Sequence, residues 1–362
     1  MRLGVEAAIV DGALVAGDVE IADGRIAAVG LAGGGSGTAV PGFVDLQVNG
    51  FGGVDFAAAD AGEYRRAGDA LLETGVTAFQ PTLITAPEDD LVAALREVPP
   101  DSIGPRILGV HLEGPFLSRE RIGAHPLDAR RDPDLALAER LLAAGPVTYM
   151  TLAPELDGAL ELIDALHARG VVVSCGHSNA TAEEAGRAFD RGVATVTHLC
   201  NAMRPFHHRE PGIAGAALAR EDVIVQVILD GVHLADDTVR VVRAAAPGRT
   251  ALVTDAIAAA AVGDGTVRLG GVEVEVRDGV ARRAGGALAG SVVTMPEAIR
   301  SLHRLGAPLL EAIAAATAVP ARVARRSDVG TLTVGGTADV VVLDDRLEVR
   351  SVHVGGRDRV AA

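Results

Sequence analysis

The sequence predicts an α/β protein, a (β/α)8 TIM-like barrel with a small β-sandwich domain built from both chain termini. Two observations lead to this fold class. Between residues 41 and 330, short apolar runs alternate with Ala/Glu/Arg-rich segments of helical spacing, as in βαβ units around a parallel sheet. Residues 1–40 and 331–362 instead alternate short β-like runs with tight turns. Neither end makes a good core alone, so we expect the two ends to pair into one small domain.

Eight apolar runs of the central region are the expected barrel strands. In chain order they read PGFVDLQVNG, VTAFQPTL, RILGVHLEGPF, VTYMTLAPE, VVVSCGHS, VATVTHLCN, VIVQVILDGVHL and TALVTDAI. Eight strands match a closed (β/α)8 barrel. An open, doubly wound sheet is the alternative, and the lack of a GxGxxG motif that opens a helix after the first run argues against it.

Helices are expected between most of these runs. AGEYRRAGDALLETG follows the first run and TAEEAGRAFDRG the fifth, both with helical spacing. Beyond the last run, residues 262–285 alternate again and contain an Asp-Gly turn, which predicts a β-hairpin inserted into the barrel. Two helical stretches, MPEAIRSLHRLG and LLEAIAAATAVPARVARR, then have the apolar spacing of helices that face a core.

Composition excludes several classes of function. The 362 residues carry a formal net charge of −15, which argues against a nucleic-acid surface. Apolar stretches end well before the ~18 residues of a membrane span, and no secretory signal is visible, so we expect a cytoplasmic protein that does not enter a membrane. The chain contains no Lys, which excludes a Schiff base or a carbamylated metal bridge.

Polar residues at the ends of the expected strands are the candidate site, because the loops after the strands carry the chemistry of such barrels. His177 and His198 follow successive strands, and with Glu113 they make a ligand set that suits Zn²⁺ with an open position. The alternative is that Glu113 caps a turn and the histidines satisfy buried backbone groups. Asp255 ends the last run, where it could act as a general base, or could simply be a surface or capping residue.

Seven motifs in register resemble one known family. HLEGPFL, GHSNAT, THLCNAM, REPGIAG, DGVHL, VTDAI and LAGS are similar to the N-acetylglucosamine-6-phosphate deacetylases of the amidohydrolase superfamily, and the likeness runs from PGFVDLQVNG to GTADVVVLD. The resemblance implies hydrolysis of the acetamide of N-acetyl-D-glucosamine 6-phosphate to D-glucosamine 6-phosphate and acetate. It also implies one divalent metal per subunit, with Zn²⁺ the expected ion, and a homodimer.

The resemblance also implies roles for individual residues. Glu113, His177 and His198 would bind the metal, and Asp255 would be the general base and acid. The residues matched to substrate contacts are Ala124, His125, Asn201, Ala202, Arg209, His233, Leu288, Ala289 and Gly290. Of these, His125 would lie near the acetamido group, Asn201 and Ala202 would meet the phosphate, and Arg209 would reach the phosphate of the neighbouring subunit.

One departure from the wider superfamily narrows the expected metal site. Many members begin the barrel with His-x-His, whereas Gln47 and Asn49 occupy those positions here. Neutral amides are poor Zn²⁺ ligands compared with imidazole, so we expect a single metal.

Two rival functions remain open from the sequence. The first is an amidohydrolase that acts on another N-acetylated amino sugar or on an N-acyl amino acid. The second is a catalytically silent barrel used for binding or assembly, which the presence of Glu113, His177, His198 and Asp255 disfavours.

Overall fold

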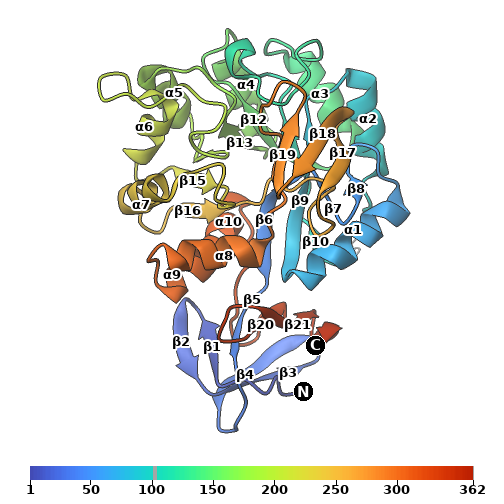
Figure 1. The fold of residues 1–362 in the computed structure, drawn as a ribbon, viewed down its shortest axis with the longest axis vertical. Coiled ribbons are helices and arrows are strands. Elements are labelled where there is room, and N and C mark those ends of the chain that lie inside the picture. Colours follow the sequence, from blue (N-terminus) through green and yellow to red (C-terminus); the bar gives the residue numbers. More distant parts are fainter. Residues whose placement is uncertain (101–103, 362) are drawn as a thin grey trace.

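The computed structural model describes residues 1–100 and 104–361. Its architecture confirms the predicted fold class. Figure 1 shows a barrel of strands surrounded by helices, with a smaller β domain at one end that carries both chain termini.

The eight predicted strands form one parallel sheet that curves into the barrel. They are β6 (Phe43–Val48), β9 (Val76–Ile84), β10 (Arg106–Ile107) continued by β11 (Val110–Glu113), β12 (Val147–Leu152), β13 (Val172–Cys175), β14 (Thr195–Val196), β15 (Ile224–Val227) and β16 (Thr250–Leu252). Each strand pairs with the next in chain order, from β6 with β9 through to β15 with β16. The strands are buried almost throughout, which explains why they read as continuous apolar runs.

The first and last strands meet at a seam that side chains help to close. Val48 and Ala256 form an isolated parallel bridge across it. The buried carboxyl of Asp45 accepts two further hydrogen bonds across the seam. The backbone N–H of Thr254 donates to it at 3.2 Å, and the hydroxyl of Thr254 donates to it at 2.6 Å. Burial raises the pKa of Asp45 to about 7. The closed seam places the end of the first strand beside the end of the last.

Helices cover the outside of the barrel. They are α1 (Ala61–Glu73), α2 (Glu88–Glu97), η1 (Arg119–Arg121), α3 (Leu135–Ala144), α4 (Ala159–Ala168), α5 (Ala182–Asp190), α6 (Gly212–Leu218), α7 (Asp236–Ala245), α8 (Met295–Arg304), α9 (Leu309–Ala315) and α10 (Ala318–Val323). α1 and α5 begin at capping boxes formed by Asp60 with Glu63 and by Thr181 with Glu184. Within the described ranges, no helix has the length and apolar character needed to cross a membrane.

The second helical stretch expected near the end of the barrel is two helices, α9 and α10. The chain leaves the helical conformation at Thr317, whose φ is −133° and ψ is −89°. Pro320 lies three residues further on, and its ring and missing N–H are incompatible with a continuous helix through this point.

The smaller β domain joins the two ends of the chain. Its six-stranded sheet has the order β2 (Ala13–Ala16), β1 (Ala7–Val10), β5 (Thr38–Pro41), β20 (Val340–Leu343), β21 (Val349–Val354) and β22 (Arg357–Ala361), and a separate hairpin contains β3 (Asp18–Ala22) and β4 (Arg25–Leu31). An antiparallel ladder from Val340 opposite Pro41 to Leu343 opposite Thr38 ties the ends together. Apolar side chains from both ends share one core cluster. The boundaries after residue 40 and before residue 331 stay a prediction.

Two short inserted sheets lie among the barrel loops. Where the sequence predicts a hairpin near residues 262–285, an antiparallel sheet of three strands forms from β17 (Gly265–Leu269), β18 (Val272–Arg277) and β19 (Val280–Arg283). The extra strand follows from a second tight turn, Gly270–Gly271, besides the predicted Asp278–Gly279. β7 (Gly50–Phe51) and β8 (Val54–Asp55) pair just after the first barrel strand.

Candidate active site

The carboxyl ends of the barrel strands surround a pocket with a volume of about 260 Å³. Most of the residues that the sequence singled out line this pocket. They are Glu113, Ala124, His125, His177, His198, Asn201, Ala202, His233, Asp255, Leu288 and Gly290. Segments that are far apart in the sequence therefore meet at one mouth of the barrel.

Two of the predicted site residues lie outside the pocket lining. Ala289 is fully buried, and its backbone N–H donates to the carbonyl of Ala281 in the inserted sheet. Arg209 is exposed, and its guanidinium lies 2.8 Å from Nε2 of His208. Arg209 therefore does not contribute to the pocket of its own chain.

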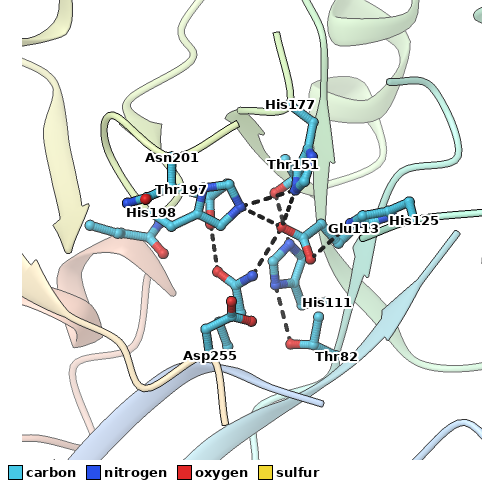
Figure 2. Close-up of polar contacts among 12 residues, drawn as sticks. Thr82, His111, Glu113, His125, Thr151, His177, Thr197, His198, Asn201 and Asp255 are labelled. Atoms are coloured by element: carbon cyan, nitrogen blue, oxygen red, sulfur yellow. Dashed lines mark hydrogen bonds and ion pairs between the residues drawn. The ribbon is translucent and has the colours of Figure 1, made fainter. Parts of the chain in front are cut away.

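Glu113 is the centre of the site. Its Oε1 atom lies 2.8 Å from Nε2 of His198 and 3.2 Å from Nε2 of His177, and the two nitrogens are 3.1 Å apart. Figure 2 shows the two rings and the carboxylate pointing toward one another. Zn²⁺ binds nitrogen at about 2.0–2.1 Å, so a tetrahedral site places neighbouring ligand atoms roughly 3.3 Å apart. The spacing of the three atoms is therefore close to that of a metal-binding face.

Hydrogen-bond partners decide which nitrogen of each ring carries a hydrogen. Nδ1 of His177 lies 2.9 Å from the backbone carbonyl of Arg121, which can only accept, so Nε2 of His177 keeps a free lone pair. The order is reversed in His125, because the backbone N–H of Thr85 donates to its Nδ1 at 3.2 Å, and the Thr85 hydroxyl, 2.9 Å from the same atom, can donate to it as well. Nε2 of His125 then carries the hydrogen and faces Oε2 of Glu113 at 3.5 Å. His177 is thus arranged to bind a cation, and His125 to donate a hydrogen bond.

Lone pairs on the histidine rings decide between two possible sets of metal ligands. Glu113, His125 and His177 offer ligand atoms within 4.8 Å of one another, the spacing of a metal site. His198 belongs to the same cluster, because its Nε2 atom lies closer to Glu113 than the ring nitrogen of either other histidine. Since Nε2 of His125 carries a hydrogen, the set with lone pairs available for a cation is Glu113, His177 and His198. Three protein ligands with a free position are typical of catalytic zinc sites.

The ionisation of the cluster also suits a cation. Burial alone would raise the pKa of Glu113, but the rings of His125, His177 and His198 beside its carboxylate hold that pKa well below its usual range. Burial lowers the pKa of His177 to about 4, so this ring is neutral at pH 7. Burial would lower the pKa of His198 too, but its hydrogen bond to Glu113 and the charge of that carboxylate raise it. A divalent ion would compete with the proton on His198.

The two amides at the end of the first strand donate to carboxylates. Nε2 of Gln47 donates to Oε1 of Glu113 at 3.0 Å, while its own Oε1 accepts from the hydroxyl of Thr197 at 2.6 Å. Nδ2 of Asn49 donates to Oδ1 of Asp255 at 2.7 Å. An amide N–H has no lone pair to offer, so these contacts support the expectation of a single metal.

Asp255 faces this cluster across the pocket, opposite His177 in Figure 2. Its burial and then the negative charge of Glu113 raise its pKa to about 7. Asp255, His177 and His198 all have left-handed backbone conformations, with φ of 50°, 46° and 25°. Such conformations cost about 1–3 kcal/mol each for residues with a Cβ and tend to occur where function requires them. Strain at three chemically active residues marks this pocket as the candidate active site.

Sequence reasoning missed Asp230. Its Oδ2 atom lies 2.7 Å from Nδ1 of His233, and its Oδ1 accepts the backbone N–H groups of Val232 and His233 at 2.9 and 2.8 Å. The carboxylate keeps the hydrogen of His233 on Nδ1, so Nε2 remains as an acceptor in the pocket. The spacing Asp-x-x-His after the seventh strand was the available signal.

Four apolar residues of the pocket lining were also missed. They are Ile84, Ile228, Leu269 and Ala287, and Leu269 comes from the inserted sheet. Gly123 lies against the His177 ring, where an added Cβ would be 3.0 Å from Cε1, and its φ of +60° favours glycine. No local sequence signal assigns these residues to a site.

Comparisons with known proteins agree with this geometry. A model of the amidohydrolase family matches residues 38–358. N-acetylglucosamine-6-phosphate deacetylase from Rattus norvegicus is 42% identical over 334 residues, which cover 87% of this chain and 82% of the relative. N-acetylgalactosamine-6-phosphate deacetylase from Escherichia coli O157:H7 is 35% identical, covering 88% of this chain and 86% of the relative.

Solved structures are also similar to this chain in fold and sequence. A variant N-acetyl-D-glucosamine-6-phosphate deacetylase from Mycobacterium smegmatis, in complex with N-acetyl-D-glucosamine-6-phosphate, superposes with a TM-score of 0.95 at 38% identity. The alignment covers 100% of this chain and 99% of that one.

The hydrogen positions in the cluster generate a prediction about metal binding. We expect His198→Asn to lose a bound divalent ion and His125→Asn to retain it, because of these two rings only His198 can offer its Nε2 atom as a ligand. The measurement is the Zn²⁺ content of each purified variant after saturation and desalting. Removal of a ligand should weaken binding by more than the roughly 10- to 100-fold that loss of a supporting contact causes.

His208→Asn, a change at an exposed ring outside the pocket, is the matched control and should bind Zn²⁺ like the unaltered protein. If His125→Asn loses the ion as completely as His198→Asn does, the assignment of hydrogens in the cluster is wrong.

Proposed function

This chain belongs to the amidohydrolase family, and we propose that it is an N-acetylglucosamine-6-phosphate deacetylase. It hydrolyses the acetamide of N-acetyl-D-glucosamine 6-phosphate to D-glucosamine 6-phosphate and acetate, a step of amino-sugar catabolism. The observation that carries this conclusion is the convergence of Glu113, His177 and His198 in one pocket that also contains Asp255. The relatives named above support the choice of substrate.

Glu113, His177 and His198 would hold one divalent ion per subunit, and Zn²⁺ is the metal we propose. A carboxylate with two imidazoles is a common Zn²⁺ set, and the spacing of these groups and the lone pair on Nε2 of His177 fit it. A bound ion would polarise the amide carbonyl and lower the pKa of a water molecule toward ~7.

Asp255 is proposed as the general base and then the general acid. It accepts a proton from the water that attacks the carbonyl carbon, and it returns this proton to the sugar nitrogen as the C–N bond breaks. The hydrogen bond from Asn49 holds one carboxylate oxygen and leaves the other for the transfer. One water is consumed, and the products are an amine and a carboxylic acid.

His125 and His233 have complementary hydrogen-bonding roles. Nε2 of His125 presents a hydrogen beside Glu113, so it can donate to the carbonyl oxygen as negative charge develops there. Such a donor contributes about 2.7–4 kcal/mol in other enzymes. Nε2 of His233 presents a lone pair, so it can accept from a hydroxyl of the sugar.

The sugar phosphate is proposed to bind at the end of β14, against the backbone of Asn201 and Ala202. A chain with a net charge of −15 needs a local cation for this group. Arg209 is exposed and lies outside its own pocket, and its guanidinium contacts the ring of His208 rather than a carboxylate. We therefore propose that Arg209 reaches the phosphate in the neighbouring subunit of a homodimer. Leu288, Ala289 and Gly290 are proposed to line the rest of the substrate site.

N-acetyl-D-galactosamine 6-phosphate is the second candidate substrate, because the relative from Escherichia coli O157:H7 is named for it. A cytoplasmic location stays a prediction from the sequence.

The direct test of the function is release of acetate by the Zn²⁺-loaded protein. We expect turnover of N-acetylglucosamine 6-phosphate, slower turnover of its galactosamine epimer, and little turnover of sugars without the 6-phosphate. Asp255→Asn should keep its metal and fold but lose at least about 100-fold in kcat, as is usual when a proton-transfer group is removed. No acetate release by metal-loaded protein would contradict the function, and near-normal turnover by Asp255→Asn would contradict the role of that residue.

The pH dependence of this activity has a defined sign. Asp255 must be ionised to accept a proton, so kcat/KM should fall as the pH is lowered through its pKa. Burial raises that pKa to about 7 without metal, and a nearby divalent cation lowers it, so the midpoint should lie below 7.

Arg209→Ala tests the phosphate site. We expect KM for the phosphorylated sugar to rise by roughly 10-fold or more, because charge-assisted hydrogen bonds to phosphate contribute about 1.5–3 kcal/mol. Arg240→Ala, at an exposed arginine of α7 outside the pocket, is the control and should leave KM unchanged. An unchanged KM in Arg209→Ala would exclude the proposed phosphate contact.

A further inference from the structure

The proposed function leaves the inserted sheet β17–β19 without a role. Its inward side chains do not belong to the main barrel core but to a separate apolar cluster with residues of the barrel loops. That cluster contains Ile84, Ala124, Ile257, Ala259, Leu269, Val274, Val276, Ala281 and Ala289. Figure 1 shows the sheet in orange. The sheet thus packs against the region that contains the site.

Two members of this cluster, Ile84 and Leu269, also line the pocket. Leu269 ends β17, and the next residue, Gly270, packs so closely on Ile84 that an added Cβ would lie 2.6 Å from Cγ1 of Ile84. Oδ2 of Asp55 holds this turn by accepting the backbone N–H of Gly270 at 3.0 Å. Both side chains are almost fully buried, so they form a fixed apolar wall.

The wall adjoins the groups that face the reacting carbonyl. Ile84 is directly opposite Glu113 in the β9–β11 ladder. The following residue, Thr85, binds the ring of His125 through its backbone N–H. A carbonyl oxygen that accepts a hydrogen bond from Nε2 of His125 therefore lies on the same side of the pocket as Ile84.

The wall also lies across the barrel from the proposed phosphate site. In the strand order of the closed barrel, β9 and β14 are half-way round from one another. β14 leads to Asn201 and Ala202, which the function assigns to the sugar phosphate. A substrate whose phosphate is at β14 extends its acyl group toward β9.

We propose that the inserted sheet forms the acyl-binding wall of the active site, and that Ile84 and Leu269 receive the methyl group of the acetamide and exclude longer acyl chains. The proposal rests on the proposed function. The carbonyl carbon bears an oxygen directed to His125, a nitrogen attached to the sugar, and the methyl group. Among the surroundings described, the apolar wall is the complement of that methyl. An extra methylene against a fitted apolar pocket changes discrimination by about 10- to 200-fold.

The experiment compares kcat/KM for the N-acetyl and N-propionyl forms of glucosamine 6-phosphate. The propionyl-to-acetyl ratio should rise roughly tenfold or more in Leu269→Ala and in Ile84→Ala, because each substitution makes room for a methylene. Val274→Ala is the matched control: Val274 is buried in the same cluster but does not line the pocket, so its ratio should stay within about twofold of the unaltered protein. Leu269→Phe should shift preference the other way, toward the N-formyl substrate.

Each outcome bears on a separate claim. An unchanged ratio in Leu269→Ala and Ile84→Ala, with normal melting temperature and bound Zn²⁺, would overturn the acyl wall. A propionyl-to-acetyl ratio that rises as much in Val274→Ala as in Leu269→Ala would also overturn it, because the packing of the whole sheet, and not the pocket lining, would then determine which acyl chains are accepted. Should the alanine variants fail to fold, the formyl-to-acetyl ratio of Leu269→Phe decides. If the unaltered protein hydrolyses none of these substrates, the proposed function fails instead.

Discussion

The buried carboxylate of Glu113 is the interaction on which the site depends. A charge in a barrel interior is stable only if donors or a cation surround it. Here the amide of Gln47, on the first strand, donates to Glu113, and the rings of His177 and His198, at the ends of β13 and β14, lie beside the carboxylate where they can share a cation with it. β6 and β14 are far apart in the strand order, so Gln47 and His198 reach Glu113 together only when the barrel is closed, and the seam at Asp45 and Thr254 helps to close it. The cation-binding cluster therefore depends on barrel closure.

The hydrogen bonds around the cluster assign different tasks to chemically similar side chains. A backbone N–H donates to Nδ1 of His125, so this ring presents a hydrogen to the pocket. Nδ1 of His177 and Nδ1 of His233 instead donate to a backbone carbonyl and to a carboxylate, so both rings present a lone pair. The small β domain takes no part in this, since both chain termini lie at the far end of the molecule in Figure 1. The inserted sheet β17–β19 is instead continuous with the pocket through Leu269.

The sequence was sufficient for the barrel and for the polar residues at its strand ends. Parallel strands buried on both faces produce uninterrupted apolar runs, and the residue that ends each run must lie at the same mouth, which is why Glu113, His177, His198 and Asp255 could be grouped. Ile84 and Leu269 could not be assigned to the same pocket from the sequence, because their contact depends on how an insertion folds back over the barrel. The break at Thr317 was hidden because the apolar spacing continues through it. Hydrogen positions on the rings likewise depend on backbone groups that only the fold brings near.

We propose that Glu113, His177 and His198 together bind one catalytic metal ion. Anomalous diffraction at the zinc absorption edge, from crystals grown with Zn²⁺, tests it most directly. We expect a single peak within bonding distance of Nε2 of His177, Nε2 of His198 and a carboxylate oxygen of Glu113, with His125 outside bonding distance. Two peaks, or one peak bonded to His125 in place of His198, would contradict it.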